Sequence, residues 1–152
     1  MKKLTLISAL AVSLILVFTG CSSNSGESQA TDSSAERTFN YYTAEQTKDA
    51  IENAEDVILL DIQVEEEWEA HHIKGAIPTH AYPVKTDEEK AKLDVVIDDL
   101  QGDQPIIVIC PGGAGGATRT IEYLETKGIA PERLFILENG QSKWPYEDIL
   151  EK

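Results

Sequence analysis

Two hydrophobic patterns alternate along residues 38–152. Residues 57–60, 106–109 and 134–137 are continuous apolar runs, which are typical of strands buried on both faces of a parallel sheet. Segments of helical character lie between and around these runs. The helical segments are residues 43–54, 65–71, 86–100 and 117–127. This alternation of strands and helices predicts an α/β fold with a mainly parallel sheet.

Short sequence motifs support several of the predicted helix and strand boundaries. Thr43 and Gln46 have the spacing of a capping box, and Gly128 follows the last predicted helix as a C-cap. Within residues 86–100, apolar side chains recur on one helical face. Residues 39–41 alternate as a short edge strand would.

The first 20 residues have the pattern of an export signal. Two lysines precede an apolar stretch at residues 4–18, and Gly20-Cys21 follows that stretch. A cysteine after small residues resembles the bacterial lipobox, which implies lipid attachment at Cys21. The alternative is a transmembrane anchor, but about 15 apolar residues fall short of the roughly 20 that span a bilayer. We therefore predict a signal peptide at residues 1–20 of a bacterial lipoprotein.

The next segment is polar. Residues 22–37 contain no leucine, isoleucine, valine or aromatic residue and are rich in serine. Such a composition cannot bury enough apolar surface to offset the entropy lost on ordering. Residues 21–37 are therefore predicted to form a lipid-anchored flexible linker, and residues 38–152 a single folded domain.

The net charge of −14 limits the partners that the chain is expected to have. Nucleic acid and anionic lipid head groups attract basic surfaces, so an acidic chain is not expected to bind either. The charge favours solubility. We expect contact with a membrane only through the N-terminal lipid.

The candidate chemistry lies at Cys110. This cysteine follows the apolar run at residues 106–109, and four glycines occur among the next six residues. Ligand sites of open α/β sheets lie at the carboxyl ends of strands, and glycines allow several main-chain N–H groups to converge there. Together with the following helix N-terminus, these groups would stabilise a thiolate or a persulfide anion. The alternative is a buried, inert cysteine.

Two phosphate-binding interpretations do not fit this loop. A Walker motif needs a lysine, and none occurs between Gln104 and Lys127. The dinucleotide fingerprint G-x-G-x-x-G fails because Thr118 stands in the place of its last glycine.

Several motifs resemble those of the rhodanese family, and they occur in the order found in that family. They are residues 57–61, 65–68, 72–78, 106–119 and 137–144. The resemblance implies a rhodanese-like three-layer fold, with a central sheet flanked by helices. It also implies that Cys110 is the nucleophile that accepts sulfane sulfur and passes it on.

The resemblance assigns roles to further residues. The active-site loop would comprise Pro111, Gly112, Gly113, Ala114, Gly115, Gly116 and Ala117. Arg119 would orient this loop or attract anionic donors. Asp61 would support the end of its strand, and Trp144 would pack beneath the site.

The chain departs from the family pattern at three places. Arg119 follows Cys110 by nine residues, so the loop is longer than the common C-x4-R loop. Gln63 and Gln141 replace an arginine and a glycine that the motifs often have. The related phosphatase motif H-C-x5-R does not fit, because Ile109 precedes the cysteine and the arginine is too distant.

No metal or organic cofactor is implied. His71 and His72 are adjacent, so they point apart on a helix, and no further ligand stands at metal-binding spacing.

The sequence therefore predicts an exported, lipid-anchored sulfurtransferase whose domain faces the extracytoplasmic side. Cys110 would take sulfur from a small sulfur-containing anion, such as thiosulfate, or from polysulfide, and would pass it to an unidentified thiol or protein. The alternative is a catalytically inactive rhodanese-like binding or redox-sensing module at the membrane surface.

Overall fold

The computed structural model describes residues 37–152. Within this range, five parallel strands form a sheet in the order β1-β6-β5-β2-β4, and β3 pairs with β7 in a small antiparallel sheet. The strands are β1 (Asn40–Tyr42), β2 (Ile58–Asp61), β3 (His72–Ile73), β4 (Ile77–Pro78), β5 (Ile106–Ile109), β6 (Leu134–Leu137) and β7 (Leu150–Glu151). The predicted signal peptide and the linker up to residue 36 lie outside the described residues.

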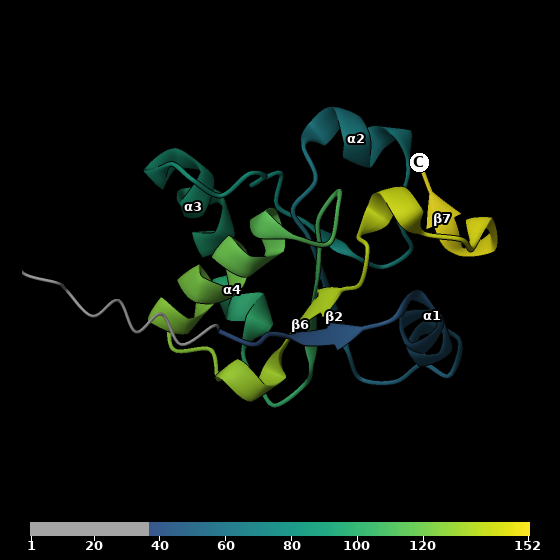
Figure 1. The fold of residues 1–152 in the computed structure, drawn as a ribbon, viewed down its shortest axis with the longest axis horizontal. Helices are drawn as coiled ribbons and strands as arrows, with labels where there is room; N and C mark the ends of the chain where they lie inside the picture. The colour runs from purple at the N-terminus through teal and green to yellow at the C-terminus, as the bar shows by residue number, and fades with distance from the viewer. Residues whose placement is uncertain (1–36) are drawn as a thin grey trace, which may run out of the picture. The chain divides into compact units, whose positions relative to one another are not determined.

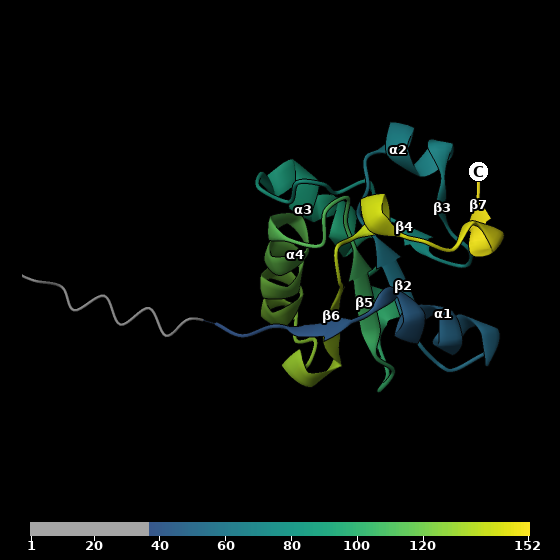
Figure 2. The ribbon, with the colours of Figure 1, turned by 45° about the vertical axis from the view of Figure 1, so that its right-hand side comes forward.

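Helices cover both faces of the main sheet, so the described part of the chain has three layers. Figure 1 shows α3 and α4 on one side of the sheet and α1 on the other. In Figure 2, the arrowheads mark the carboxyl ends of β2 and β5, and α2 and the β3–β7 pair lie beyond these ends. The helices are α1 (Ala44–Glu52), α2 (Glu65–Ala70), α3 (Asp87–Asp94) and α4 (Gly115–Thr126), with 3-10 turns η1 (Ile97–Leu100), η2 (Pro131–Arg133), η3 (Gln141–Lys143) and η4 (Glu147–Ile149). This arrangement confirms the predicted α/β fold.

The central strand β5 is buried along its whole length, because each face of the sheet is covered. Its side chains alternate between two clusters. Ile106 and Val108 belong to the cluster on the α4 side, and Ile107 and Ile109 belong to the cluster on the α1 side. Each such side chain contributes about 1.5–3 kcal/mol of burial free energy. The strand is therefore a firm base for the residue that follows it.

The local signals at two helices are confirmed. Thr43 accepts a hydrogen bond from the main-chain N–H of Gln46, and the Gln46 side chain accepts one from the N–H of Thr43. Gly128 follows α4 with a φ of 88°, the left-handed conformation of a C-cap glycine. None of the helices in residues 37–152 is long and apolar enough to cross a membrane.

The helix predicted over residues 86–100 is wrong in its second half. α3 ends at Asp94, and the 3-10 turn η1 follows after a break. The break falls on Val95 and Val96, two β-branched residues whose side chains are restricted in a helix. The apolar face predicted for residues 86–100 still points into the core, because Val96 and Leu100 are buried. Val95 lies off this face and is 81% exposed. The start of α4 also differs from the prediction, at Gly115 instead of residue 117.

The burial of β5 leads to a stability prediction. Ile107→Ala should lower the free energy of unfolding by about 2–5 kcal/mol, because it leaves a cavity in a covered sheet. Val95→Ala should change it by less than about 0.5 kcal/mol, because that side chain faces solvent. Urea unfolding of both variants measures the difference. Equal losses would contradict the proposed position of the core.

Candidate functional site

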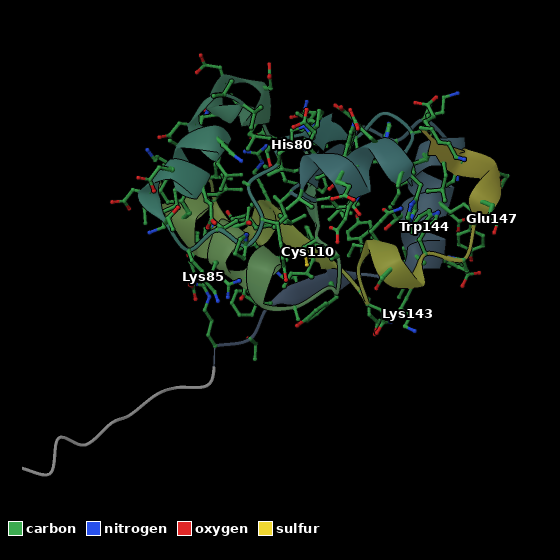
Figure 3. The ribbon with its side chains drawn as sticks, turned by 90° about the horizontal axis from the view of Figure 1, so that it is seen from above. His80, Lys85, Cys110, Lys143, Trp144 and Glu147 are labelled. Atoms are coloured by element: carbon green, nitrogen blue, oxygen red, sulfur yellow. The ribbon has the colours of Figure 1, made fainter. Side chains whose placement is uncertain are left out.

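Cys110 lies at the carboxyl end of β5, where the chain enters the loop to α4. Its side chain is 1% exposed and belongs to the cluster on the α4 side, which includes Ile62 and Ala117. In Figure 3, Cys110 lies near the centre of the molecule, between Lys85 on one side and Trp144 on the other. The cysteine thus occupies the edge of the sheet at which α/β proteins place their ligands.

The loop after Cys110 has a row of unpaired donors. None of the main-chain N–H groups of residues 112–117 donates to an acceptor within the described part of the chain. The first main-chain hydrogen bond of α4 runs from Thr118 to the carbonyl of Ala114, at 3.2 Å. Unpaired N–H groups at the start of a helix favour an anion through their partial positive charge. The six consecutive donors therefore form a candidate anion site.

The cysteine sulfur itself receives no hydrogen bond from a residue in the range 37–152. Its surroundings within the α4-side cluster are apolar. Along the loop, Gly112 and Ala114 are exposed, whereas Gly116 and Ala117 at the start of α4 are buried. A second sulfur atom bound to Cys110 would extend about 2 Å beyond Sγ.

A segment after β6 holds this loop in place through the main chain. Gln141 donates from its N–H to the carbonyl of Cys110 at 2.9 Å, and Ser142 donates to the carbonyl of Pro111 at 3.0 Å. In a trans peptide, the C=O and the N–H point in opposite directions. The bond to Pro111 therefore turns the N–H of Gly112 away from Ser142.

The approach of these two segments requires glycine at two positions. Gly113 and Gly140 both have a φ of 64°, in the left-handed region. A Cβ on Gly140 would lie 2.3 Å from the carbonyl oxygen of Cys110, and a Cβ on Gly113 would lie 2.5 Å from the nitrogen of Gly140. Neither distance is compatible with a side chain.

Asp61 ends β2, the neighbour of β5, and pairs in register with Ile109. Its carboxylate accepts hydrogen bonds from the main-chain N–H of Gln63 at 2.7 Å and from the Gln63 side chain at 3.1 Å. Burial raises the pKa of Asp61 to about 7, and the bonds from Gln63 offset only part of this effect. Asp61 thus supports the turn after β2, and Gln63 occupies the position where arginine often stands in the family motif.

Arg119 contacts a segment that lies far from the cysteine loop in the sequence. Its Nε donates to the carbonyl of Pro83 at 2.8 Å, and its guanidinium lies beside Gly115. It borders a hollow of about 370 Å³ together with Lys85, which we call the α4 pocket. Arg119 therefore ties the start of α4 to residue 83.

Trp144 packs on the opposite face of the sheet from the cluster that contains Cys110. It belongs to the α1-side cluster with Ile107 and Ile109, and its indole N–H donates to the carbonyl of Tyr146 at 2.8 Å. It supports the strand that carries the cysteine.

Two histidines near the site, His72 and His80, are engaged in other contacts. His72 stacks on Trp68 with ring centroids 3.6 Å apart, and its Nδ1 lies 3.0 Å from the Trp68 carbonyl oxygen. His80 contacts the carbonyl oxygen of Gln63 at 3.3 Å. Within residues 37–152 there is no cluster of three or more His, Cys, Asp or Glu that is arranged to hold a metal ion.

A second hollow of about 470 Å³ borders the cysteine loop, and we call it the α2 pocket. Its walls include α2 and the loop residue Pro111. Gln141 also lines it, and its side-chain amide is buried without a hydrogen-bond partner among the described residues. Sequence reasoning noted Gln141 only as a departure from glycine. That departure was the signal that a polar group had been added to the site.

The fold and the site define a class of protein: a parallel α/β domain with a cysteine at the end of its central strand and a glycine-rich loop before a helix. A family model described as the rhodanese-like domain matches residues 43–146. The chain belongs to this family.

Solved structures have the same fold at low sequence identity. A Bacillus halodurans protein is 22% identical with a TM-score of 0.55, covering 69% of this chain and 70% of that one. The rhodanese-like domain of an Anabaena protein is 20% identical with a TM-score of 0.56, covering 75% and 80%. A rhodanese-like domain protein from Staphylococcus aureus is 22% identical with a TM-score of 0.55, covering 74% and 97%. No curated protein sequence gives a significant match.

The buried carboxyl group predicts a pH effect on stability. Because the pKa of Asp61 is about 7 in the folded state and near 3.8 when solvated, the unfolded chain loses this proton first as the pH rises. The contribution of Asp61 to stability is therefore fully present below about pH 4 and is lost as the pH rises through 7. The free energy of unfolding of Asp61→Asn, relative to that of the parent protein, should therefore be more favourable at pH 8 than at pH 4.5. The expected difference is on the order of 1–4 kcal/mol.

Urea unfolding of Asp61→Asn and of the parent protein at both pH values measures this effect. The exposed Asp56 supplies the control, because Asp56→Asn should have nearly the same effect at both pH values. If Asp61→Asn also had equal effects at pH 4.5 and pH 8, Asp61 would not be buried as described.

The tight contact at Gly140 predicts a loss of stability on substitution. Gly140→Ala should destabilise the protein by about 2–4 kcal/mol, because a methyl group collides with the main chain of Cys110 and Gly113. Gly75→Ala is a matched control, since Gly75 has a φ of 78° but no atom near its added Cβ. The control should lose only about 1 kcal/mol. Thermal unfolding that ranks the two variants equally would refute the close approach.

Proposed function

We propose that the chain is an extracytoplasmic sulfurtransferase that carries sulfane sulfur as a persulfide on Cys110. The observation that carries this proposal is the row of unpaired N–H groups in residues 112–117, directly after the cysteine. Such donors stabilise negative charge on an atom placed among them. Membership of the rhodanese-like family supports a function of the sulfurtransferase type.

The donors suit a persulfide better than a thiolate. The Cys110 sulfur lies in apolar surroundings, whereas the loop residues Gly112 and Ala114 are exposed. The outer sulfur of Cys–S–S⁻ carries the charge and extends about 2 Å beyond Sγ. It would leave the apolar cluster and approach the loop donors, so the site favours the loaded state. An anion that gains several main-chain donors is stabilised relative to its solvent-exposed form.

The proposed loading step is a nucleophilic displacement. The Cys110 thiolate attacks the sulfane sulfur of thiosulfate, the new S–S bond forms, and sulfite leaves with the electron pair of the broken S–S bond. With polysulfide the leaving group is a shorter polysulfide. No oxidant or reductant is required, because a sulfane sulfur atom is passed on. The loop must move for the donor to enter, since Cys110 is only 1% exposed.

The proposed location follows from residues 1–37. An export signal with lipid on Cys21 would place the domain outside the cytoplasmic membrane, tethered through residues 22–37. The small-anion donor and the acceptor would then be extracytoplasmic molecules.

A second candidate function is a catalytically silent binding or redox-sensing module. It is favoured by the burial of Cys110 and by the absence of any hydrogen bond from residues 37–152 to its sulfur. In that case Cys110 would be a packing residue, and free cysteine is often buried in this way.

Mass spectrometry of the intact protein separates the two candidates. Incubation with thiosulfate or polysulfide should add about 32 Da, the mass of one sulfur atom, and dithiothreitol should remove it. Cys110→Ala should abolish the gain. Cys21→Ala should retain it, because the chain has two cysteines and the proposal concerns only one.

Two results would contradict the sulfurtransferase proposal. One is an unchanged mass with every donor. The other is a gain that persists in Cys110→Ala and disappears in Cys21→Ala. Either would favour the silent module.

A further inference from the structure

The α2 pocket has an acidic wall. Glu66 and Glu67 of α2 line it, both are exposed, and neither forms an ion pair within the described part of the chain. None of the residues that line this pocket is lysine or arginine, and His71 is its basic side chain. Two unpaired carboxylates beside the entrance repel a small anion and attract a cation.

Gln141, which lines the same pocket, adds an independent observation. Its side chain is 3% exposed, and neither its amide nitrogen nor its amide oxygen has a hydrogen-bond partner in residues 37–152. A buried amide without partners is costly, so such a group points to a missing ligand.

The chemistry of the missing ligand follows from the amide. A carboxamide offers two N–H donors and one carbonyl acceptor, which match the C=O and N–H of a peptide group. An inorganic anion would leave the acceptor unpaired. The pocket also has apolar wall residues, Val64 and Pro111, that suit the body of a side chain.

We infer that the α2 pocket recognises a basic peptide segment that carries the acceptor cysteine. This inference rests on the proposed function and names the class of its acceptor: a protein thiol flanked by arginine or lysine. The glutamates attract the cationic side chains, and Gln141 pairs with a peptide group of the segment. Pro111 places the pocket directly beside the residue that carries the sulfur.

The transfer step balances without another reactant. The acceptor thiolate attacks the outer sulfur of the Cys110 persulfide, and the S–S bond to Cys110 breaks. Cys110 regains its thiolate, and the acceptor becomes a persulfide anion. One negative charge is carried by each partner before and after the step.

The test uses the full chain, loaded with sulfur by polysulfide, and two short peptides with one cysteine each. The cysteine is flanked by arginines in one peptide and by glutamates in the other. Mass spectrometry follows the loss of about 32 Da from the protein and its gain by the peptide. The arginine peptide should accept sulfur at least about tenfold faster at low ionic strength.

Charge variants on one helix give the matched comparison. The double variant Glu66→Gln, Glu67→Gln should reduce the ratio of the two peptide rates to about threefold or less. Glu69→Gln on the same helix should preserve the ratio, because Glu69 is exposed but does not line the pocket. A ratio near one in the unmodified protein, or an equal effect of Glu69→Gln, would overturn the inference while leaving the sulfurtransferase proposal intact.

Binding measurements test the pocket independently of sulfur transfer. Fluorescence anisotropy with labelled serine versions of the peptides should show preferential binding of the arginine peptide. Gln141→Met should weaken that binding about tenfold while the melting temperature stays equal or rises, since it removes an unpaired buried amide. Unchanged binding in Gln141→Met, or a lower melting temperature with unchanged binding, would show that Gln141 has no part in recognition. If the protein cannot be loaded with sulfur, the proposed function fails, and the anisotropy result still decides whether the pocket binds basic peptides.

Discussion

Two main-chain hydrogen bonds, from Gln141 and Ser142 to the carbonyls of Cys110 and Pro111, hold the cysteine loop on which the site depends. They engage the carbonyls of the Cys110–Pro111 and Pro111–Gly112 peptides, of which only the second carries an N–H group. Residues 111–112 form a turn, and no well-formed main-chain hydrogen bond from the N–H groups of residues 112–117 is present within the described part of the chain. Left-handed glycines at 113 and 140 allow the two segments to approach this closely, and the buried strand β5 fixes where the loop begins. A backbone arrangement of this kind holds an anion without a charged side chain.

Basic and acidic side chains lie in two separate pockets of the described domain. The α4 pocket contains Lys85 and Arg119, whereas the α2 pocket contains Glu66 and Glu67. The chain has a net charge of −14, so the basic residues of the α4 pocket stand out from the rest of the protein. A charged molecule would therefore be attracted to one pocket and repelled by the other. The proposed basic acceptor would approach from the acidic side. Asp61, whose pKa is raised by burial, lies beside the end of the cysteine strand and pairs with Ile109.

Much of the fold could be predicted because its signals are local. Continuous apolar runs indicate the central strands, and Thr43 with Gln46 indicates the start of α1. The break at Val95 was missed, because the apolar face of the segment continues through the break and hides it. The position of Cys110 at the end of a strand follows from the sequence. The direction of Arg119 does not, because its partner is the carbonyl of Pro83, 36 residues earlier in the chain. The unpaired amide of Gln141 also depends on what surrounds it in space.

We propose that the amides of the cysteine loop hold the charge of a sulfur atom carried by Cys110. Amide NMR spectra recorded before and after loading with polysulfide measure this. We expect downfield shifts of several N–H protons in residues 112–117 on loading, reversed by dithiothreitol, while amides of α1 remain in place. Loading on Cys110 with no change at the loop amides would show that they do not hold the charge.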